Sequence, residues 1–225
     1  MLVSVLALAV AANPGPLAVV QNIDAEVQKV LKSDNPTVEK LAERADTFVD
    51  FGELARRAMG SDWNGLKKKQ QDEFTATMKG LLRASYAQKA ISDDRVAATV
   101  EYGAEKIEGN EATVPSTLTL KKDKFEVIYK LYRPNEKAAW RVYDVITDEV
   151  SLVGTYQDQF RKVMAKSGFD GLLEQLKKKK EKVEADNAAK KDEKKAAAKG
   201  DQGGDQGGTK PDVAKAGTGG GAQQN

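Results

Sequence analysis

The 225-residue sequence contains no cysteine and no histidine. Their absence excludes disulfide bonds, thiolate nucleophiles, the usual zinc-ligand sets and any mechanism that moves protons through an imidazole ring. The sequence also lacks a Walker loop, a GxGxxG fingerprint and an acidic metal-binding loop. We therefore expect no nucleotide or metal cofactor.

The chain has little net charge. Its 36 Lys and Arg residues nearly balance 34 Asp and Glu residues, which leaves +2. Residues 177–225 carry 12 Lys and 8 acidic residues, or +4, so the preceding part carries 24 minus 26, or −2. A region of near-zero charge lacks the basic surface that contacts to a phosphate backbone require, and we expect no nucleic-acid partner.

The N-terminal residues 1–12 (MLVSVLALAVAA) form an apolar run that is too short to span a bilayer. The run resembles a secretory signal peptide, with Ala9-Val10-Ala11 as the cleavage site. Such signals ordinarily begin with Lys or Arg, which this run lacks, so we expect that translation starts further upstream or that the N-terminus has been trimmed. A buried first strand or helix is the alternative.

The C-terminal residues 177–225 are rich first in Lys, then in Ala and Lys, and finally in Gly, Gln and Asp. Such a segment buries too little apolar surface to order itself, so we predict a disordered tail. Within it, the run Lys177 to Lys180 either extends the preceding helix as a solvated face or attracts anionic lipid headgroups. The remaining chain is long enough for one domain, which we place at 17–176 and expect to be monomeric.

Hydrophobic spacing divides this domain into helical and extended parts. Apolar residues recur at helical spacing over 20–31 and 38–49, in the short segment 51–59 and over 64–90. After Asp93 the period becomes two, which predicts strands at 96–107, 111–120, 125–133 and 139–147. Helical spacing returns from Leu152 to Leu176 with a stop at Gly168.

Short connections between the predicted strands favour an antiparallel meander. A sheet with one apolar face needs a cover, and helices are the available cover. We therefore predict an α+β fold in which N-terminal and C-terminal helices wrap a curved four-stranded antiparallel sheet around a hydrophobic cavity. The sequence does not decide which face of the strand 139–147 points inward. One set of side chains, Trp140, Val142 and Ile146, is as apolar as the other, Tyr143 and Val145.

Asp144 is the one carboxylate deep in a hydrophobic strand. A lone buried Asp can abstract a proton next to a carbonyl, so a small-molecule enzyme on a cone-like fold is one alternative function. Its oxyanion donors would be Tyr86, Tyr129 or Tyr143. Asp144 also fits a structural role, either capping backbone amides near Ser151 or pairing with Arg141.

Two blocks of residues carry a resemblance to a known family. The first is FVDFGELARRAMG at 48–60, followed by Trp63, Gln70, Phe74, Leu81-Leu82 and Tyr86. The second is WRVYDV at 140–145, followed by VSLV at 150–153, Tyr156, Phe160 and GFDGL at 168–172. Together they resemble the MlaC, or toluene-tolerance, family of periplasmic phospholipid-binding proteins from about Asp24 to Leu176. Two positions depart from the family: Glu149 stands where Gly is usual, and Gln157 where Arg is common.

The resemblance implies a non-enzymatic periplasmic carrier with phospholipid as its cargo. Such a carrier shuttles lipid between an outer-membrane lipoprotein complex and an inner-membrane ABC transporter complex with a substrate-binding ring, and so maintains outer-membrane lipid asymmetry. It says nothing about the tail at 177–225. A non-lipid envelope interaction module, with its interior filled by side chains, is the remaining alternative.

Two acyl chains have about 14 to 16 methylenes each, and removing one methylene from water contributes about 0.8 kcal/mol. Transfer of both chains out of water therefore represents roughly 22 to 26 kcal/mol, and the protein needs a dry slot to provide it. Each candidate to line that slot also fits a plain hydrophobic core. We expect the headgroup to stay in water at the mouth, with weak headgroup selectivity and no obligatory buried Arg or Lys. The candidate lipid-binding residues are Phe48, Phe51, Leu54, Met59, Phe74, Met78, Leu81, Leu82, Tyr86, Leu118, Val127, Tyr129, Leu131, Val142 and Ile146.

Overall fold

The computed structural model describes residues 13–90 and 97–200. The chain divides into two compact units, the first ending at Asn187 and the second beginning at Ala188. Of the second unit, the described residues are the helical, Ala- and Lys-rich stretch 188–200. The signal-like segment 1–12, the first residue of the predicted strand 96–107 and the Gly-rich end of the predicted tail, 201–225, lie outside the described residues.

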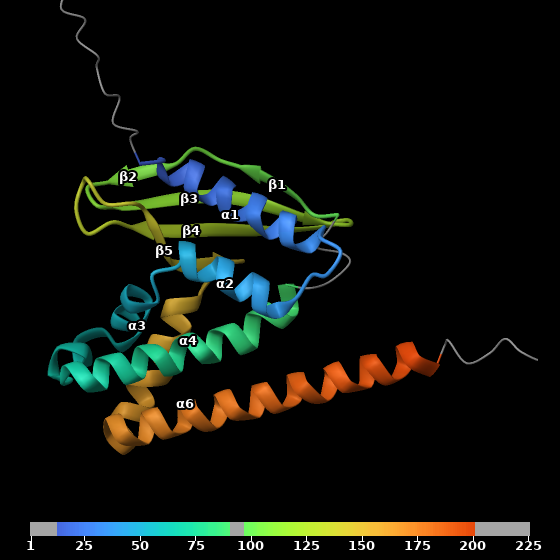
Figure 1. Cartoon of the computed structure of the whole chain (residues 1–225). Helices are drawn as coiled ribbons and strands as arrows, with labels where there is room; N and C mark the ends of the chain where they lie inside the picture. Colours follow the sequence, from blue (N-terminus) through green and yellow to red (C-terminus); the bar gives the residue numbers. More distant parts are fainter. Residues whose placement is uncertain (1–12, 91–96, 201–225) are drawn as a thin grey trace, which may run out of the picture. The chain divides into compact units, whose positions relative to one another are not determined.

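The first unit opens with helices (Figure 1). They are α1 (Pro16–Leu31), α2 (Val38–Phe48), α3 (Phe51–Met59), the 3-10 helix η1 (Gly60–Gly65) and α4 (Lys68–Ala90). Side-chain caps fix the first turns of α2 and α3. Thr37 accepts a hydrogen bond from the backbone N–H of Lys40, and Asp50 accepts one from the backbone N–H of Glu53. The bounds predicted for α3 are confirmed, whereas α4 starts later than the predicted residue 64 because η1 occupies that stretch.

Over residues 13–90 and 97–200 the structure has one antiparallel sheet of six strands, so the prediction of four is wrong. They are β1 (Thr99–Tyr102), β2 (Lys106–Glu108), β3 (Glu111–Leu120), β4 (Asp123–Tyr132), β5 (Arg141–Thr147) and β6 (Val150–Ser151), in the order β1-β3-β4-β5-β6 with β2 also paired to β3. The predicted strand 96–107 is interrupted where the backbone N–H of Gly103 donates to the carbonyl of Pro115 at 2.8 Å. The sixth strand lies at the predicted start of the last helix.

A two-residue turn joins β5 to β6. Thr147 pairs with Val150, and the two residues between them, Asp148 and Glu149, have positive φ angles of 47° and 67°. Two-residue hairpin turns with this backbone favour glycine at the second position. Glu149 therefore holds a glycine-like conformation at the position where the resembled family usually has glycine.

A β-bulge in β5 decides which of its side chains face α1. Lys130 pairs with Asp144 but Leu131 pairs with Val142, which leaves Tyr143 as the extra residue. Val142 lies beside Leu131, and Val145 lies beside Tyr129, so both share the face that packs against Val20 of α1. Ile146 pairs with Ile128 on the opposite face. The inward-facing set is thus neither Trp140, Val142 and Ile146 nor Tyr143 and Val145, because the bulge places Val142 and Val145 on the same face.

The last helix, α6 (Leu152–Gly200), breaks at Gly168, where φ is 65° and ψ is −171°. Figure 1 shows α6 as two helical segments that meet at a sharp turn. The predicted stop at Gly168 is thus confirmed as a break, after which the helix resumes.

The helical segment after the break continues well past the predicted domain end at Leu176. Lys177 pairs with Glu73 of α4 at 2.6 Å, Val183 packs on the helical core, and the Asn187 side-chain amide donates to the Ala84 carbonyl at 2.7 Å. The structure therefore contradicts the predicted disorder for 177–187, because these residues find packing partners on α4. It also describes 188–200 as helical, where the composition predicts a disordered tail.

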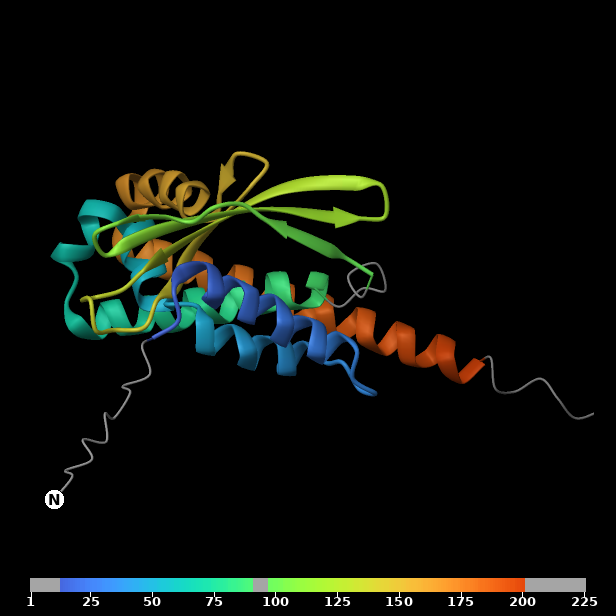
Figure 2. The same cartoon turned by 90° about the horizontal axis from the view of Figure 1, so that it is seen from above.

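Two principal hydrophobic clusters hold the first unit together. In one, α3, α4 and α6 enclose fully buried side chains such as Phe74, Met78 and Leu81. In the other, Val19 and Val20 of α1 pack on β3, β4 and β5. Both views show α1 running along the sheet (Figures 1 and 2). A smaller cluster joins the end of α1 to Leu41 of α2.

Candidate functional site

A pocket of about 710 Å³ lies where members of all three clusters meet. Its volume falls in the range typical of small-molecule binding sites. Among the described residues that line it, four are charged, namely Arg44, Arg83, Asp144 and Lys179. The other lining residues are mainly aliphatic and aromatic: Ile23, Val27, Leu41, Ala42, Ala45, Phe48, Val49, Phe51, Leu54, Leu82, Tyr86, Tyr129, Val142, Tyr143, Val145, Thr147, Val150, Leu152, Thr155, Tyr156 and Gln159.

The corner between α2 and α3 is fixed to the sheet at the pocket wall. Val49 forms an isolated parallel bridge with Val142, and the backbone N–H of Asp50 donates to the Val142 carbonyl at 2.8 Å. The guanidinium of Arg141 donates to the carbonyls of Asp46 and Val49 at 2.9 and 2.8 Å. These bonds hold the apolar side chains of the corner against β5.

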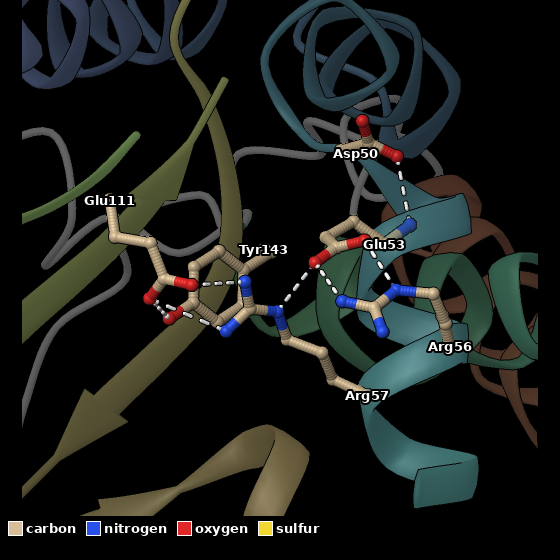
Figure 3. A network of polar contacts seen from close by, with 6 residues as sticks. All are labelled: Asp50, Glu53, Arg56, Arg57, Glu111 and Tyr143. Carbon is tan, nitrogen blue, oxygen red and sulfur yellow. Dashed lines mark hydrogen bonds and ion pairs between the residues drawn. The ribbon is translucent and has the colours of Figure 1, made fainter. Parts of the chain in front are cut away.

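A polar network reinforces this wall, beginning at Glu53 of α3 (Figure 3). The Glu53 carboxylate, 9% exposed, receives two hydrogen bonds from Arg56, at 2.8 and 2.6 Å, and one from Arg57 at 2.7 Å. Burial alone would raise the pKa of Glu53, but hydrogen bonds and charge from the two arginines outweigh it and hold the pKa below the ordinary 4.5. Glu53 is therefore a buried anion with two cationic partners.

Arg57 carries the network from α3 to the sheet (Figure 3). Its guanidinium donates to Glu111 of β3 at 2.6 Å, and the Tyr143 hydroxyl donates to the same carboxylate at 3.1 Å. Burial alone would lower the pKa of Arg57, but its hydrogen bonds to Glu111 and Glu53 outweigh burial and raise the pKa. Burial also raises the pKa of Tyr143 to about 12, so the phenol stays protonated. The network thus ties α3 to β3 and β5.

Asp144 caps the start of α6. Its Oδ1 accepts a hydrogen bond from the backbone N–H of Val153 at 3.0 Å, and its Oδ2 accepts one from the Ser151 hydroxyl at 2.7 Å. The residue borders the pocket and is only 3% exposed. Of the roles considered for Asp144, the structure supports the capping one, because both carboxylate oxygens are engaged by the helix start.

Comparison with known families decides the relationship that the motifs suggested. A family model described as MlaC protein matches residues 18–178. The chain belongs to the MlaC family. Among solved structures, it is similar to a phospholipid-binding protein from Ralstonia solanacearum determined in complex with a phospholipid, at 24% identity and a TM-score of 0.66 over 74% of this chain and 97% of that one. At this identity the likeness shows a shared fold. No curated protein matches the chain.

Seven of the fifteen predicted lipid-contact residues line the main pocket of this MlaC-family chain: Phe48, Phe51, Leu54, Leu82, Tyr86, Tyr129 and Val142. Leu118 and Val127 line a second pocket of about 260 Å³, which shares Tyr129, Val145 and Thr147 with the first. The shared residues make the two pockets neighbours along the same face of the sheet.

The other six predicted residues line neither of these pockets. Met59, Phe74, Met78 and Leu81 lie in the helical core, where the Phe74 ring packs edge-on against Phe160 with centroids 5.4 Å apart. Leu131 is buried beneath α1. Ile146 lies on the opposite face of the sheet because the bulge at Tyr143 shifts the alternation.

None of the predicted lipid-contact residues lies on α1 or the first turns of α2, which form one wall of the pocket. Ile23 and Val27 of α1 and Leu41, Ala42 and Ala45 of α2 line this wall. Their helical spacing was visible in the sequence, but spacing alone does not say which partner a stripe meets. Leu152 and Tyr156 of α6 belong to the resemblance motifs and also line the pocket.

The described residues contain no group of three or more acidic side chains that could hold a metal ion. Over the same residues, every helix is too short or too polar to cross a bilayer.

Proposed function

We propose that this MlaC-family protein is a phospholipid carrier that holds the acyl chains of its cargo in the main pocket. The observation that carries the proposal is an apolar pocket of about 710 Å³ at the junction of helices and sheet in a chain of this family. The Ralstonia protein of the same fold, determined in complex with a phospholipid, supports the same cargo.

The chemistry of the pocket suits acyl chains. Each methylene removed from water contributes about 0.8 kcal/mol, so a wall of side chains such as Phe48, Leu54 and Leu82 replaces the contacts that the chain loses on leaving a bilayer. The second pocket extends the apolar surface along the sheet past Tyr129. The free energies of the lipid in the pocket and in the bilayer are nearly equal, so lipid exchange needs no catalytic residue. Partner docking, or ATP hydrolysis by another protein, sets the direction of transfer.

Membership of the family and the signal-like residues 1–12 support a wider role. We place the protein in the periplasm, exported by the segment 1–12, where it carries phospholipid between an outer-membrane lipoprotein complex and an inner-membrane ABC transporter complex with a substrate-binding ring. In this role it maintains outer-membrane lipid asymmetry. Asp144 contributes as a helix cap, and no step of the function passes through it.

A vesicle transfer assay tests the carrier. The full chain is mixed with donor vesicles of phosphatidylcholine containing a fluorescent phosphatidylglycerol and with unlabelled acceptor vesicles. We expect the protein to accelerate transfer, and Leu82→Trp, which fills the pocket, to slow it. Ile107→Trp adds the same side chain at an exposed position outside the pocket and should transfer as the wild type does. Transfer no faster than without protein would overturn the proposal.

A further inference from the structure

The four lysines of the run at 177–180 do not have equivalent surroundings. Lys177 pairs with Glu73 at 2.6 Å, Lys178 with Glu174 at 2.6 Å and Lys180 with Glu184 at 3.3 Å. Among the described residues, no carboxylate lies within ion-pair distance of Lys179, and this lysine lines the main pocket. The run is therefore three ion-paired lysines and one that faces the pocket.

The break at Gly168 explains how Lys179 reaches the pocket. It turns the second segment of α6 back toward the first, so the Lys179 ammonium lies 5.8 Å from the ring centre of Tyr156, although 23 positions separate them. Tyr156 is buried and lines the pocket. Burial raises the pKa of Tyr156 to about 12, with a smaller contribution from the charge of the nearby Tyr86 of α4. Gln159 lines the same region. An ammonium, two phenols and an amide thus provide hydrogen-bond donors beside an apolar cavity.

The two other cations at the pocket already have carboxylate partners. Arg44 lies 3.5 Å from Glu26, and the guanidinium of Arg83 is paired with Asp46, which also pairs with Lys79 at 2.8 Å. Lys179 is exposed at the rim, so its charge needs no buried partner and remains open to an incoming anion. This contrast selects Lys179 among the three cations that line the described part of the pocket.

We propose that Lys179 binds the phosphate of the cargo lipid at the mouth of the pocket, with Tyr86, Tyr156 and Gln159 as neighbouring donors; this inference rests on the proposed carrier function. The contact is common to all phospholipids, because each has a phosphate whatever its headgroup. It therefore distinguishes phospholipid from an uncharged diacylglycerol and is compatible with weak selectivity among headgroups. Because the site is exposed, its attraction falls as salt is added.

The test compares two lipids with the same acyl chains. Delipidated full-length protein is offered equimolar dioleoyl phosphatidylglycerol and dioleoylglycerol in micelles of a non-ionic detergent, and native mass spectrometry gives the ratio of the two complexes. We expect the wild type to prefer the phospholipid, and Lys179→Gln to reduce that preference about fivefold, the scale of an exposed ion pair. The matched control Lys178→Gln removes an exposed lysine that pairs with Glu174 and should keep the wild-type ratio.

The outcomes separate the two proposals. An unchanged ratio in Lys179→Gln, or equal binding of both lipids by the wild type, overturns the phosphate contact and leaves the carrier intact. Binding of neither lipid overturns the carrier and the contact together. A further arm adds inorganic phosphate in excess: loss of the lipid preference in its presence supports a phosphate site at Lys179. Phosphate binding that depends on Lys179 without any lipid preference would mean that free phosphate is the ligand, and would overturn the contact with the cargo.

Discussion

The guanidinium carbon of Arg57 lies 3.8 Å from the ring centre of Tyr143, and both side chains bond the carboxylate of Glu111. Arg57 belongs to α3, and Tyr143 is the bulged residue of β5 that also lines the pocket. The contact joins the helix of the FVDFGELARRAMG block to the strand of the WRVYDV block. The two blocks that carry the family resemblance are thus in direct contact beside the pocket.

Replacing Arg57 should therefore destabilise the fold. Arg57→Met leaves Glu111 without its guanidinium and Glu53 with one arginine, which we expect to cost about 1–3 kcal/mol. The free energy of unfolding from urea titration, at an unchanged m-value, measures the loss. Arg56→Met is the control, because the half-exposed Arg56 leaves Glu53 still paired to Arg57 and should cost less than about 1 kcal/mol. Equal losses in the two variants would contradict the bridging role of Arg57.

The same network predicts how stability depends on pH. The pKa values of Glu53 and Glu111 are both held below the ordinary 4.5; Arg56 and Arg57 outweigh burial at Glu53, and the hydrogen bond from Arg57 dominates at Glu111. A carboxyl whose folded pKa is lowered stabilises the protein above its unfolded pKa, and this stability is lost as the pH falls through the folded pKa. The sequence has no histidine that would titrate between pH 5 and 8.

We therefore expect the urea midpoint to be level from neutral pH down to about pH 5 and to fall below it. Glu53→Gln should be less stable at neutral pH and should lose less on acidification, since it lacks one of the two carboxylates. Urea titrations from neutral to acid pH on both proteins make the comparison. If the urea midpoints of the wild type and Glu53→Gln fell in parallel as the pH is lowered, Glu53 would not contribute to the acid sensitivity.

Glu149 offers a stabilising substitution. Its φ of 67° destabilises the folded state by roughly 1–2 kcal/mol for a residue other than glycine. Glycine avoids this strain, but it loses more conformational entropy on folding, which cancels part of the gain. Glu149→Gly should therefore gain up to about 1 kcal/mol, whereas Glu149→Ala should gain nothing. Thermal and urea unfolding of the three proteins decide between them. A loss of stability in Glu149→Gly would show that the Glu149 side chain contributes more than its backbone strain costs.

Gly168 should be intolerant of a side chain. Its φ of 65° with ψ of −171° lies in a region that is essentially restricted to glycine, so Gly168→Ala should cost about 1–3 kcal/mol or open the turn between the two segments of α6. Gly65→Ala serves as the control, because Gly65 has no positive φ and no atom within 4 Å of an added Cβ. Urea unfolding compares the two. A Gly168→Ala variant as stable as Gly65→Ala, with its lipid preference intact, would contradict the role given to the turn.

Local signals predicted the helices well but only part of the sheet. The Asp50 cap and the Gly60 end define α3 within nine residues, so its bounds could be read from the sequence. The break at Gly103 depends on a hydrogen bond to the more distant Pro115, which no local pattern reveals. The short strand β6 follows a two-residue turn whose second position holds Glu149 instead of the usual glycine, so the turn was not recognised. The number of strands was wrong for these two reasons.

The pocket was harder to predict than the core. The stripe of α4 serves two neighbours: Phe74 and Met78 face α6 within the core, whereas Leu82 and Tyr86, further along, reach the pocket. The bulge at Tyr143 moved Val145 onto the pocket face and Ile146 off it. Periodicity identifies buried faces, but the division between packed core and hollow depends on how the elements meet.

Native mass spectrometry of gently purified full-length protein, followed by identification of the bound molecule, tests the lipid-binding pocket most directly. We expect about one glycerophospholipid per chain in the wild type and in Ile107→Trp, and a clearly lower load in Leu82→Trp, with all three equally folded by urea titration. Wild-type protein that carries no glycerophospholipid and takes up none when it is offered, or a Leu82→Trp variant as fully loaded as the wild type, would contradict this expectation.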